Sequence, residues 1–244
     1  MNPLTVVHSV SPPAAQKASN RLLASLPTDD FQRLRPDLTY RPLKLRQVLH
    51  KNGERLREVY FPDRSVFSLV TNMDDGSSVE AAMVGSEGMV GIGAVLGEAF
   101  ASGDAVVQMP GNGAYSMSIE VFDREMARRG AFYDVVTRYA QVFVAMLIQS
   151  VACNGLHTAE ERACRWLLMM SDRVGRHELN VTHELLSTLL GVRRPTVTLV
   201  LAQLVKAGMI SQVRGGMRIV DRASLEAASC ECYGSVKRMF DRLM

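Results

Sequence analysis

Long hydrophobic runs are missing from this 244-residue chain, and cysteine is sparse. The longest unbroken apolar run, Val142 to Ile148, has seven residues, whereas a membrane-spanning helix needs about 20. The first 16 residues contain Pro3, Pro12 and Pro13 and no sustained apolar core, which predicts a flexible lead rather than a signal peptide. The four cysteines are too few for a disulfide framework, so free thiols are favoured. These absences predict a cytoplasmic protein with no membrane partner.

The motifs of common enzyme classes are also missing. No glycine-rich phosphate loop precedes a lysine, and no nucleophile elbow is present. The histidines do not converge with acidic residues on one site, because His8, His50, His177 and His183 are scattered along the chain. We therefore do not expect an enzyme.

The positive charge of the chain is concentrated in one segment. Lys and Arg exceed Asp and Glu by three over the whole sequence. Residues 176–222 contain seven basic and three acidic residues, a surplus of four, so the rest of the chain carries a net charge of −1. A local basic surplus is typical of a surface that docks on nucleic acid. With 47% hydrophobic residues, the chain can also bury the cores of two domains.

A helix-turn-helix pattern lies inside this basic segment. Thr182 can cap the first turn of a helix, and Gly191 can end that helix in the left-handed conformation that a sharp turn needs. Pro195 suits the first turn of a second helix, because its fixed φ and missing N–H cost nothing there. Apolar residues follow at helical spacing and predict one buried face, made of Val197, Val200, Leu201, Leu204 and Val205.

The opposite face of the second helix is predicted to contact DNA, together with Thr182. At about 100° per residue, this face carries Pro195, Thr196, Leu199, Gln203 and Lys206, with Arg193 and Arg194 at its N-terminal end. Residues 208–220 then form two alternating stretches joined by a Gly-Gly turn, which predicts a wing with Arg214 at its tip on a phosphate. Amphipathic hairpins and solvated arginine pairs are common, but the order of cap, turn, helix and wing favours a winged helix-turn-helix.

Short alternating stretches between residues 40 and 118 predict strands. They lie at 59–62, 66–70, 79–84 and 105–109, with turns at 75–76 and 111–113 and a looser alternation of Leu43, Leu45 and Leu49 before them. Their spacing predicts a β-sandwich or jelly roll. Five glycines within residues 85–97 either let the backbone approach a ligand or form corners of this roll.

From Asp123 to about Cys153 the apolar periodicity becomes helical. Residues recur at intervals of four and three, which predicts a seam between two copies of one helix, made of Val135, Tyr139, Val142, Met146 and Gln149. Burial of this stripe against its own N-terminal domain is the alternative. A dimer is favoured because two recognition helices about 34 Å apart, one DNA turn, read a palindrome.

The order of β-roll, long helix and winged helix resembles the Crp/Fnr family of bacterial transcriptional regulators from about Leu22 onwards. Several strings resemble one branch of that family without a well-defined effector. These strings are YFP at 60–62, EGMVG at 87–91, CNGLH at 153–157, RWLL at 165–168, DRV at 172–174, LGVRR at 190–194 and CECY at 230–233.

The resemblance implies an α+β fold in five segments. These are a flexible lead (1–21), a cyclic-nucleotide-binding-like sensor β-roll (22–122), a dimerisation helix (123–156), a winged helix-turn-helix (157–223) and a C-terminal tail (224–244). It implies a homodimer that binds palindromic promoter DNA and contacts RNA polymerase. A signal in the roll would move the long helices about a hinge at 157–161. The effector pocket would include Glu87, Gly88, Gly91 and Ser102.

Departures from the family pattern narrow the function. Members that bind cyclic AMP carry an Arg-Ser pair in the phosphate cassette, where this chain has FASGDA at 100–105, with no cation for the phosphate and with Asp104 to repel it. Oxygen-sensing members hold an iron–sulfur cluster on N-terminal cysteines, but no cysteine precedes Cys153 here. We expect neither cofactor. In the recognition helix Arg194 matches the family's arginine, whereas Pro195 and Leu199 replace a glutamate and a second arginine, so the operator should differ.

The cysteines leave one more constellation. Cys153 and His157 stand at i and i+4, and Cys230 and Cys232 offer two more ligands of the kind that zinc or copper prefers. If the tail folds back on the hinge, these residues would form a metal or thiol-redox switch. The alternative is that Cys153 is a buried residue of the helix seam and that the tail cysteines are incidental, because this spacing is not standard for a metal site. A nonspecific architectural DNA-binding protein is a further alternative, although the large N-terminal half argues against it.

Overall fold

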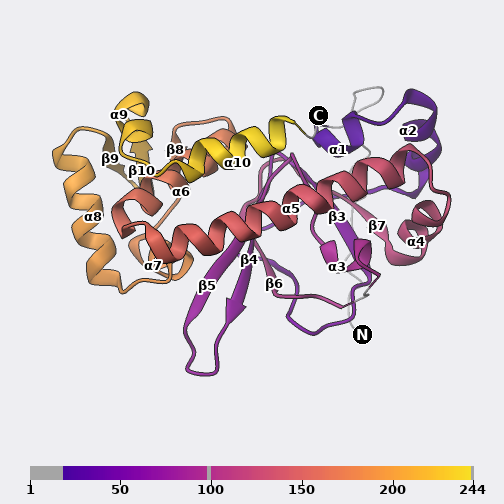
Figure 1. Ribbon diagram of the computed structural model, residues 1–244, viewed down its shortest axis with the longest axis horizontal. Coiled ribbons are helices and arrows are strands. Elements are labelled where there is room, and N and C mark those ends of the chain that lie inside the picture. Colours follow the sequence, from indigo (N-terminus) through magenta and orange to yellow (C-terminus); the bar gives the residue numbers. More distant parts are fainter. Residues whose placement is uncertain (1–18, 98–99, 243–244) are drawn as a thin grey trace, which may run out of the picture.

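The computed structural model describes residues 19–97 and 100–242. A β-roll, a long central helix and a mainly helical C-terminal half follow one another along the chain (Figure 1). The strands are β1 (Thr39–Arg41), β2 (Val48–His50), β3 (Glu58–Asp63), β4 (Val66–Asn72), β5 (Ser78–Val84), β6 (Asp104–Met109), β7 (Gly113–Ser118), β8 (Glu178–Leu179), β9 (Ile210–Val213) and β10 (Gly216–Ile219). The helices are α1 (Arg21–Ala24), α2 (Thr28–Leu34), the 3-10 turn η1 (Arg35–Asp37), α3 (Ile92–Val95), α4 (Ile119–Ala127), α5 (Ala131–Leu156), α6 (Ala159–Val174), α7 (His183–Leu190), α8 (Arg194–Lys206), α9 (Arg222–Ala227) and α10 (Cys232–Asp241). Most of the lead that the sequence predicts lies outside the described residues, and α1 already begins at Arg21.

The β-roll is a sandwich of two antiparallel sheets, with strand orders β1-β7-β3 and β2-β6-β4-β5. The predicted strands at 59–62, 66–70, 79–84 and 105–109 are confirmed as β3 to β6. Buried side chains from both sheets, such as Phe61 and Phe67, form its core. Pro62 is tolerated in β3 because β3 is an edge strand, where a missing N–H breaks no ladder. The alternation of Leu43 to Leu49 gives only the short strand β2, and Leu45 is exposed.

The single helix predicted from Asp123 is two helices. Helix α4 ends at Ala127, and the chain turns through Arg129, whose φ is 54°, before Gly130 caps α5. The ring of Phe132 packs edge-on against those of Phe61 and Phe122. This aromatic cluster ties the start of α5 to the roll, and α5 then runs past the roll to the first helices of the C-terminal half (Figure 1).

Helix α5 packs one of its faces, which carries three residues of the predicted seam, against the β-roll of its own subunit. Val135, Tyr139 and Met146 are at most 7% exposed, and the Tyr139 hydroxyl donates to the Met89 carbonyl oxygen at 3.0 Å. Gly88 lies directly beneath the Tyr139 ring, where a Cβ would come within 2.6 Å of it. The predicted dimer seam is therefore wrong for these three residues, because their own subunit already covers them.

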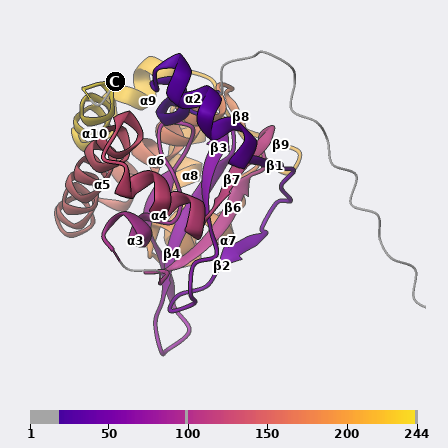
Figure 2. The ribbon, with the colours of Figure 1, turned by 90° about the vertical axis from the view of Figure 1, so that its right-hand side faces the viewer.

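Helix α5 is also long and apolar enough to span a membrane, judged by length and composition alone. The sequence-based expectation missed this because polar residues interrupt every apolar run without making the helix polar. Helices α7 and α8 pass the same test only as a pair bent by 110°. A core helix of a soluble protein has these properties as well, and α5 packs along both the roll and α10 (Figure 2).

The C-terminal half contains α6 to α10 and a small sheet of order β8-β10-β9. The segment expected only as a tail from residue 224 is largely helical. Helix α10 returns from the far end of the molecule and lies against α5 and α6 (Figure 1), with Val236 and Phe240 buried beneath it. The two ends of the C-terminal half, at α6 and α10, therefore both lie next to α5.

Candidate functional site

The helix-turn-helix forms as its caps predict. The Thr182 hydroxyl accepts from the Leu185 backbone N–H at 3.1 Å, which caps α7. Gly191 ends α7 with a φ of 61°, and α8 starts at Arg194 with Pro195 in its first turn. The 110° bend between the two helices falls in the range of helix-turn-helix units.

The outer face of α8 is open to solvent. Its buried side is formed by Val197, Val200, Leu201 and Leu204, whereas Val205, predicted as the fifth member, is 38% exposed. All predicted DNA-contacting residues are exposed, namely Thr182, Arg193, Arg194, Pro195, Thr196, Leu199, Gln203, Lys206 and Arg214. Leu199 is 62% exposed in the middle of this face, so an apolar side chain is available there for a partner.

The wing is the hairpin of β9 and β10. Its turn residues are Arg214 and Gly215, with a φ of 81° at Gly215, rather than the predicted Gly-Gly pair. Gly216 instead starts β10, where a Cβ would come within 2.1 Å of the Leu179 carbonyl oxygen. Arg214 is exposed at the tip, in the position suited to a phosphate.

The basic residues of this half fall into two groups, those that form ion pairs and those that do not. Arg218 pairs with Glu178 across two strands, and Arg222 pairs with Asp172 of α6 at 2.6 Å. Within the part of the chain that the structure describes, no ion pair engages the four cations of α8 and the wing, which are Arg193, Arg194, Lys206 and Arg214. Their charge is available to a polyanion.

Two polar contacts that the sequence did not reveal join the β-roll to α6. The Arg173 guanidinium bonds Glu87 at 2.8 Å, with both side chains about nine-tenths buried. The Trp166 indole N–H donates to the Glu80 carboxyl at 2.9 Å. Glu87 is therefore held by α6 and Gly88 by Tyr139, and neither lines the cavity of the roll described below.

Burial raises the pKa of the Glu80 carboxyl to about 7. Since this lies above the ordinary value of 4.5, the protonated form stabilises the fold. That contribution is complete below about pH 4.5 and is lost as the pH rises through about 7. As the pH rises from about 4.5 to about 7, Glu80→Gln should lose less stability than the native protein, because a glutamine side chain does not ionise. Above pH 7, Glu80→Gln should be the more stable of the two proteins. Thermal unfolding at several pH values checks this, with exposed Glu184→Gln as the control; parallel curves for Glu80→Gln and the native protein would contradict it.

The cavity of the β-roll lies between its inner sheet surface, α3 and α5. It has a volume of about 180 Å³, and its lining residues include Gly91 and Ser102, two of the four residues of the predicted effector pocket. Helix α5 contributes Phe143, Val144 and Leu147 to its wall. Among the described lining residues there is no Lys or Arg. The described wall of the cavity is therefore largely apolar and carries no acidic or basic side chain other than His50.

His50 is the one imidazole among the described residues of the cavity wall. Burial lowers its pKa, so the imidazole is neutral near pH 7. Its Nδ1 atom is buried and has no hydrogen-bond partner within the described chain. Asp104, which lies in the stretch that matches the phosphate cassette, accepts hydrogen bonds from the Asn52 backbone and the Asn72 side chain, both at 2.8 Å.

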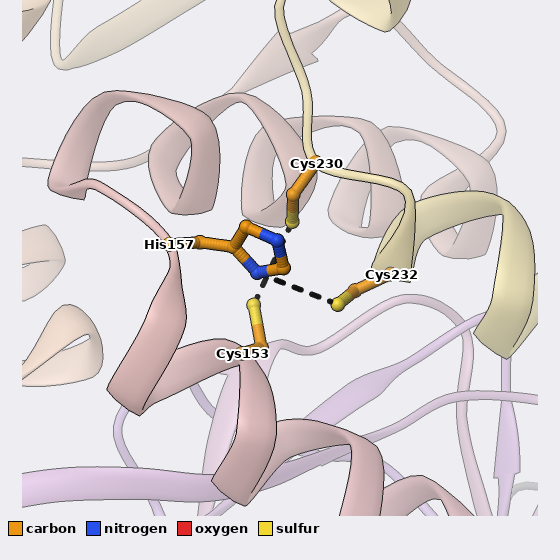
Figure 3. Close-up of side chains that lie close together, drawn as sticks. All are labelled: Cys153, His157, Cys230 and Cys232. Atoms are coloured by element: carbon orange, nitrogen blue, oxygen red, sulfur yellow. Dashed lines mark hydrogen bonds between the residues drawn. The ribbon is translucent and has the colours of Figure 1, made fainter.

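The four predicted metal or thiol residues come together. Cys153 and His157 lie at the end of α5, and Cys230 and Cys232 lie at the start of α10 (Figure 3). The sulfur atoms of Cys153 and Cys230 are 3.6 Å apart, and the Cys232 sulfur is 3.6 Å from His157 Nδ1. The contact with Cys153 lowers the pKa of the Cys230 thiol to about 6. The fourth cysteine, Cys164, is buried elsewhere in α6, and burial raises its pKa to about 12.

Comparison with known proteins matches residues 161–228 to the Crp-like helix-turn-helix domain. No curated protein matches the chain. Among solved structures, a regulator of the Crp/Fnr family from Eubacterium rectale is similar at 16% identity and a TM-score of 0.66, over 86% of this chain and 98% of that one. A Crp-family regulator from Thermus thermophilus is 20% identical, with a TM-score of 0.64 over 77% and 95%. The c-di-GMP-responsive regulator CLP of Xanthomonas campestris is 15% identical, with a TM-score of 0.61 over 79% and 99%.

Proposed function

Since residues 161–228 are a Crp-like helix-turn-helix domain within a chain that has the Crp/Fnr fold, we propose that this protein is a homodimeric, sequence-specific DNA-binding transcriptional regulator of the cytoplasm. The observation that carries the proposal is the exposed face of α8 beside a wing, with four cations that no described acidic residue neutralises. RNA polymerase would be the partner of the DNA-bound dimer at a promoter.

The DNA-reading face combines one bidentate donor with apolar contacts. Arg194, at the N-terminal end of α8, can bond the O6 and N7 atoms of a guanine in the major groove. Pro195 cannot accept from a cytosine amino group, and Leu199 offers only apolar contact, for example to a thymine methyl group. Arg193, Lys206 and Arg214 would hold the phosphate backbone. The operator would therefore contain guanine and thymine at the positions that these side chains reach.

The dimer would form through the exposed stripe of α5, defined as Val144, Ile148 and Val151. These residues follow at i, i+4 and i+7 and are 44%, 67% and 74% exposed. Aliphatic side chains at this spacing form the seam of paired helices. At about 100° per residue, the half-buried Val142 and Gln149 of the predicted seam lie on the opposite side of α5 from this stripe. The other three seam residues, Val135, Tyr139 and Met146, face the roll. The stripe thus replaces the predicted seam as the proposed dimer contact.

The effector would be a small, uncharged and largely apolar molecule. A cavity of about 180 Å³ is smaller than the 300–1,000 Å³ typical of drug-sized ligands. The imidazole of His50, which is among the lining residues, would be the polar group that orients such a ligand. Because α5 forms part of the wall, filling the cavity would bear directly on the helix that carries the exposed stripe.

Cyclic AMP is expected to leave the protein unchanged. A buried phosphate without a cation to pair with it is costly, and the described cavity wall offers none. Calorimetric titration should give no saturable heat, and the melting temperature should not shift. Saturable binding would contradict this. If that binding survived Ser102→Ala but was lost in a cavity-filling Ala82→Phe variant, the nucleotide would lie in the cavity.

The main alternative is an architectural protein that binds any duplex. The two functions separate on the ratio of affinities for a selected operator and for random DNA at fixed salt. A sequence-specific regulator is expected to show a ratio of about 10³ or more. A ratio near unity would favour the architectural protein instead.

A further inference from the structure

Four potential metal ligands meet where the end of α5 touches the start of α10. The sulfur atoms of Cys153, Cys230 and Cys232 and a ring nitrogen of His157 all lie within 4.8 Å of one another. Cys153 and Cys230 are 77 positions apart in the sequence. The fold therefore assembles the cluster from two segments that are distant in the sequence.

The spacing of the ligand atoms fits a tetrahedral zinc ion. Zinc binds thiolate sulfur at about 2.3 Å and imidazole nitrogen at about 2.0 to 2.1 Å, so the ligand atoms of a regular site are about 3.5 to 3.8 Å apart. Two of the pairs here, Cys153 with Cys230 and Cys232 with His157 Nδ1, are both 3.6 Å apart. A disulfide would need the Cys153 and Cys230 sulfur atoms at about 2.05 Å. The separation of 3.6 Å leaves these thiols unbridged and matches the spacing of two ligands of one ion.

The neighbours of the cluster orient its ligands. His157 Nε2 lies 3.1 Å from a carboxylate oxygen of Glu231, so this nitrogen can carry the proton and leave Nδ1 free, facing Cys232 (Figure 3). The Gln149 side-chain amide donates to the Cys232 sulfur at 3.0 Å. A carboxylate behind a histidine ligand and a donor to a thiolate are the outer contacts that metal sites use to fix their ligands.

Burial and charge favour a closed site. Cys153, Cys230 and Cys232 are at most 3% exposed. Three thiolates and one Zn²⁺ carry a net charge of −1, and the buried Arg165 guanidinium lies close enough to act electrostatically on Cys153 and Cys230. Four protein ligands leave no position for a substrate or water, which is the pattern of structural zinc.

We propose that Cys153, His157, Cys230 and Cys232 bind one Zn²⁺ per subunit and that this ion fastens α10 to the end of α5. Binding needs no oxidant, because the three thiols release their protons to solvent as the zinc–sulfur bonds form. The ion closes a loop from 158 to 229 that contains α6, the helix-turn-helix and the wing. Zinc would therefore set the orientation of the DNA-binding half relative to α5, a consequence that rests on the proposed function.

Metal content tests the site on the full-length protein, purified without an affinity tag or chelator. We expect one zinc per subunit by mass spectrometry of the metal. Cys232→Ser and His157→Asn should lose most of it, whereas Cys164→Ala, the cysteine outside the cluster, should keep it. Substoichiometric metal in the native protein, or equal retention in Cys232→Ser and Cys164→Ala, would overturn the proposal.

Cobalt replacement tests the ligand set. Co²⁺ added to the metal-free protein should give thiolate charge-transfer absorption and intense tetrahedral d–d bands, and both should be lost in Cys232→Ser. Glu231→Gln, a change at an exposed side chain, should keep the spectrum but weaken metal affinity by about 10- to 100-fold. Octahedral cobalt, or a Cys153–Cys230 disulfide in protein that was purified without oxygen, would contradict the site.

The docking of α10 gives a readout that does not depend on DNA. Removing zinc should speed proteolysis within residues 224–242 and alkylation of Cys230, and returning zinc should reverse both. Loss of DNA binding with zinc still bound would count against the proposed function alone. If proteolysis and alkylation were unchanged after zinc removal, the proposal that zinc fastens α10 to the end of α5 would be wrong.

Discussion

Ile148→Asp is expected to turn the proposed dimer into a monomer and to weaken binding to a palindromic operator by about 10²- to 10⁴-fold, the range over which linking two binding units raises affinity. Ile148 is the central residue of the exposed stripe and is 67% exposed in the subunit. A carboxylate there would be buried without a partner at the contact between two helices, which is costly. Sedimentation equilibrium measures the association, and fluorescence anisotropy with full and half operators measures the affinity.

Leu45→Asp is the matched control for this variant. Leu45 is also an exposed aliphatic residue, 48% exposed, but it lies in the loop before β2. It should remain dimeric with unchanged DNA affinity, and Ile148→Asp should still bind a half operator as the native subunit does. A dimeric Ile148→Asp protein, or dissociation caused by Leu45→Asp, would place the dimer contact elsewhere.

The second large effect is expected at the start of the recognition helix. Arg194→Ala should cost about 1 to 3 kcal/mol of operator binding, or about 5- to 150-fold, and relax the preference at one base pair. Arg194 is exposed and unpaired among the described residues, so its loss leaves no buried partner to destabilise the fold. Affinities for a panel of single-base operator variants measure both the cost and the preference.

Arg214→Ala provides the comparison, since the wing tip is proposed to contact phosphate. It should weaken all sequences alike and lower the salt dependence of binding by about one unit of slope. If Arg194→Ala also weakened every sequence equally, the residue would be a phosphate contact and the base-reading role would be wrong.

Local signals made the DNA-binding half predictable from sequence. Thr182, Gly191 and Pro195 act within one or two turns of their own position, so cap, turn and helix start follow from residue type alone. The strands rich in valine and phenylalanine were equally clear. Strand β7, with the sequence GAYSMS, was not predicted because it has no β-branched run and pairs through its neighbours β1 and β3.

Periodicity could not show which apolar face of α5 its own subunit covers. The helix has two such faces, one with Tyr139 and Met146 toward the β-roll and one with Ile148 and Val151 toward solvent. Both satisfy helical spacing, so only the tertiary packing distinguishes them. Glu87 was misassigned for a similar reason, because its partner Arg173 lies 86 positions away.

The cysteine cluster was visible in the sequence only as two fragments. Cys153 with His157 has the spacing of one helical turn, and Cys230 with Cys232 has none that is specific to metal. Their meeting depends on α10 folding back along α5, which no local pattern encodes. The structure therefore adds the observation on which the proposed zinc site depends, namely that the four ligand atoms lie within 4.8 Å of one another.

Selection of bound sequences from random duplex DNA at fixed salt tests the central claim most directly. A dimeric, sequence-specific regulator should enrich a palindrome whose half-sites are centred about 34 Å apart, one DNA turn. The Arg194→Ala protein should enrich the same palindrome with one position relaxed. If neither the zinc-loaded nor the metal-free protein enriches any sequence, under reducing or oxidising conditions, α8 is not a recognition helix and the account is wrong.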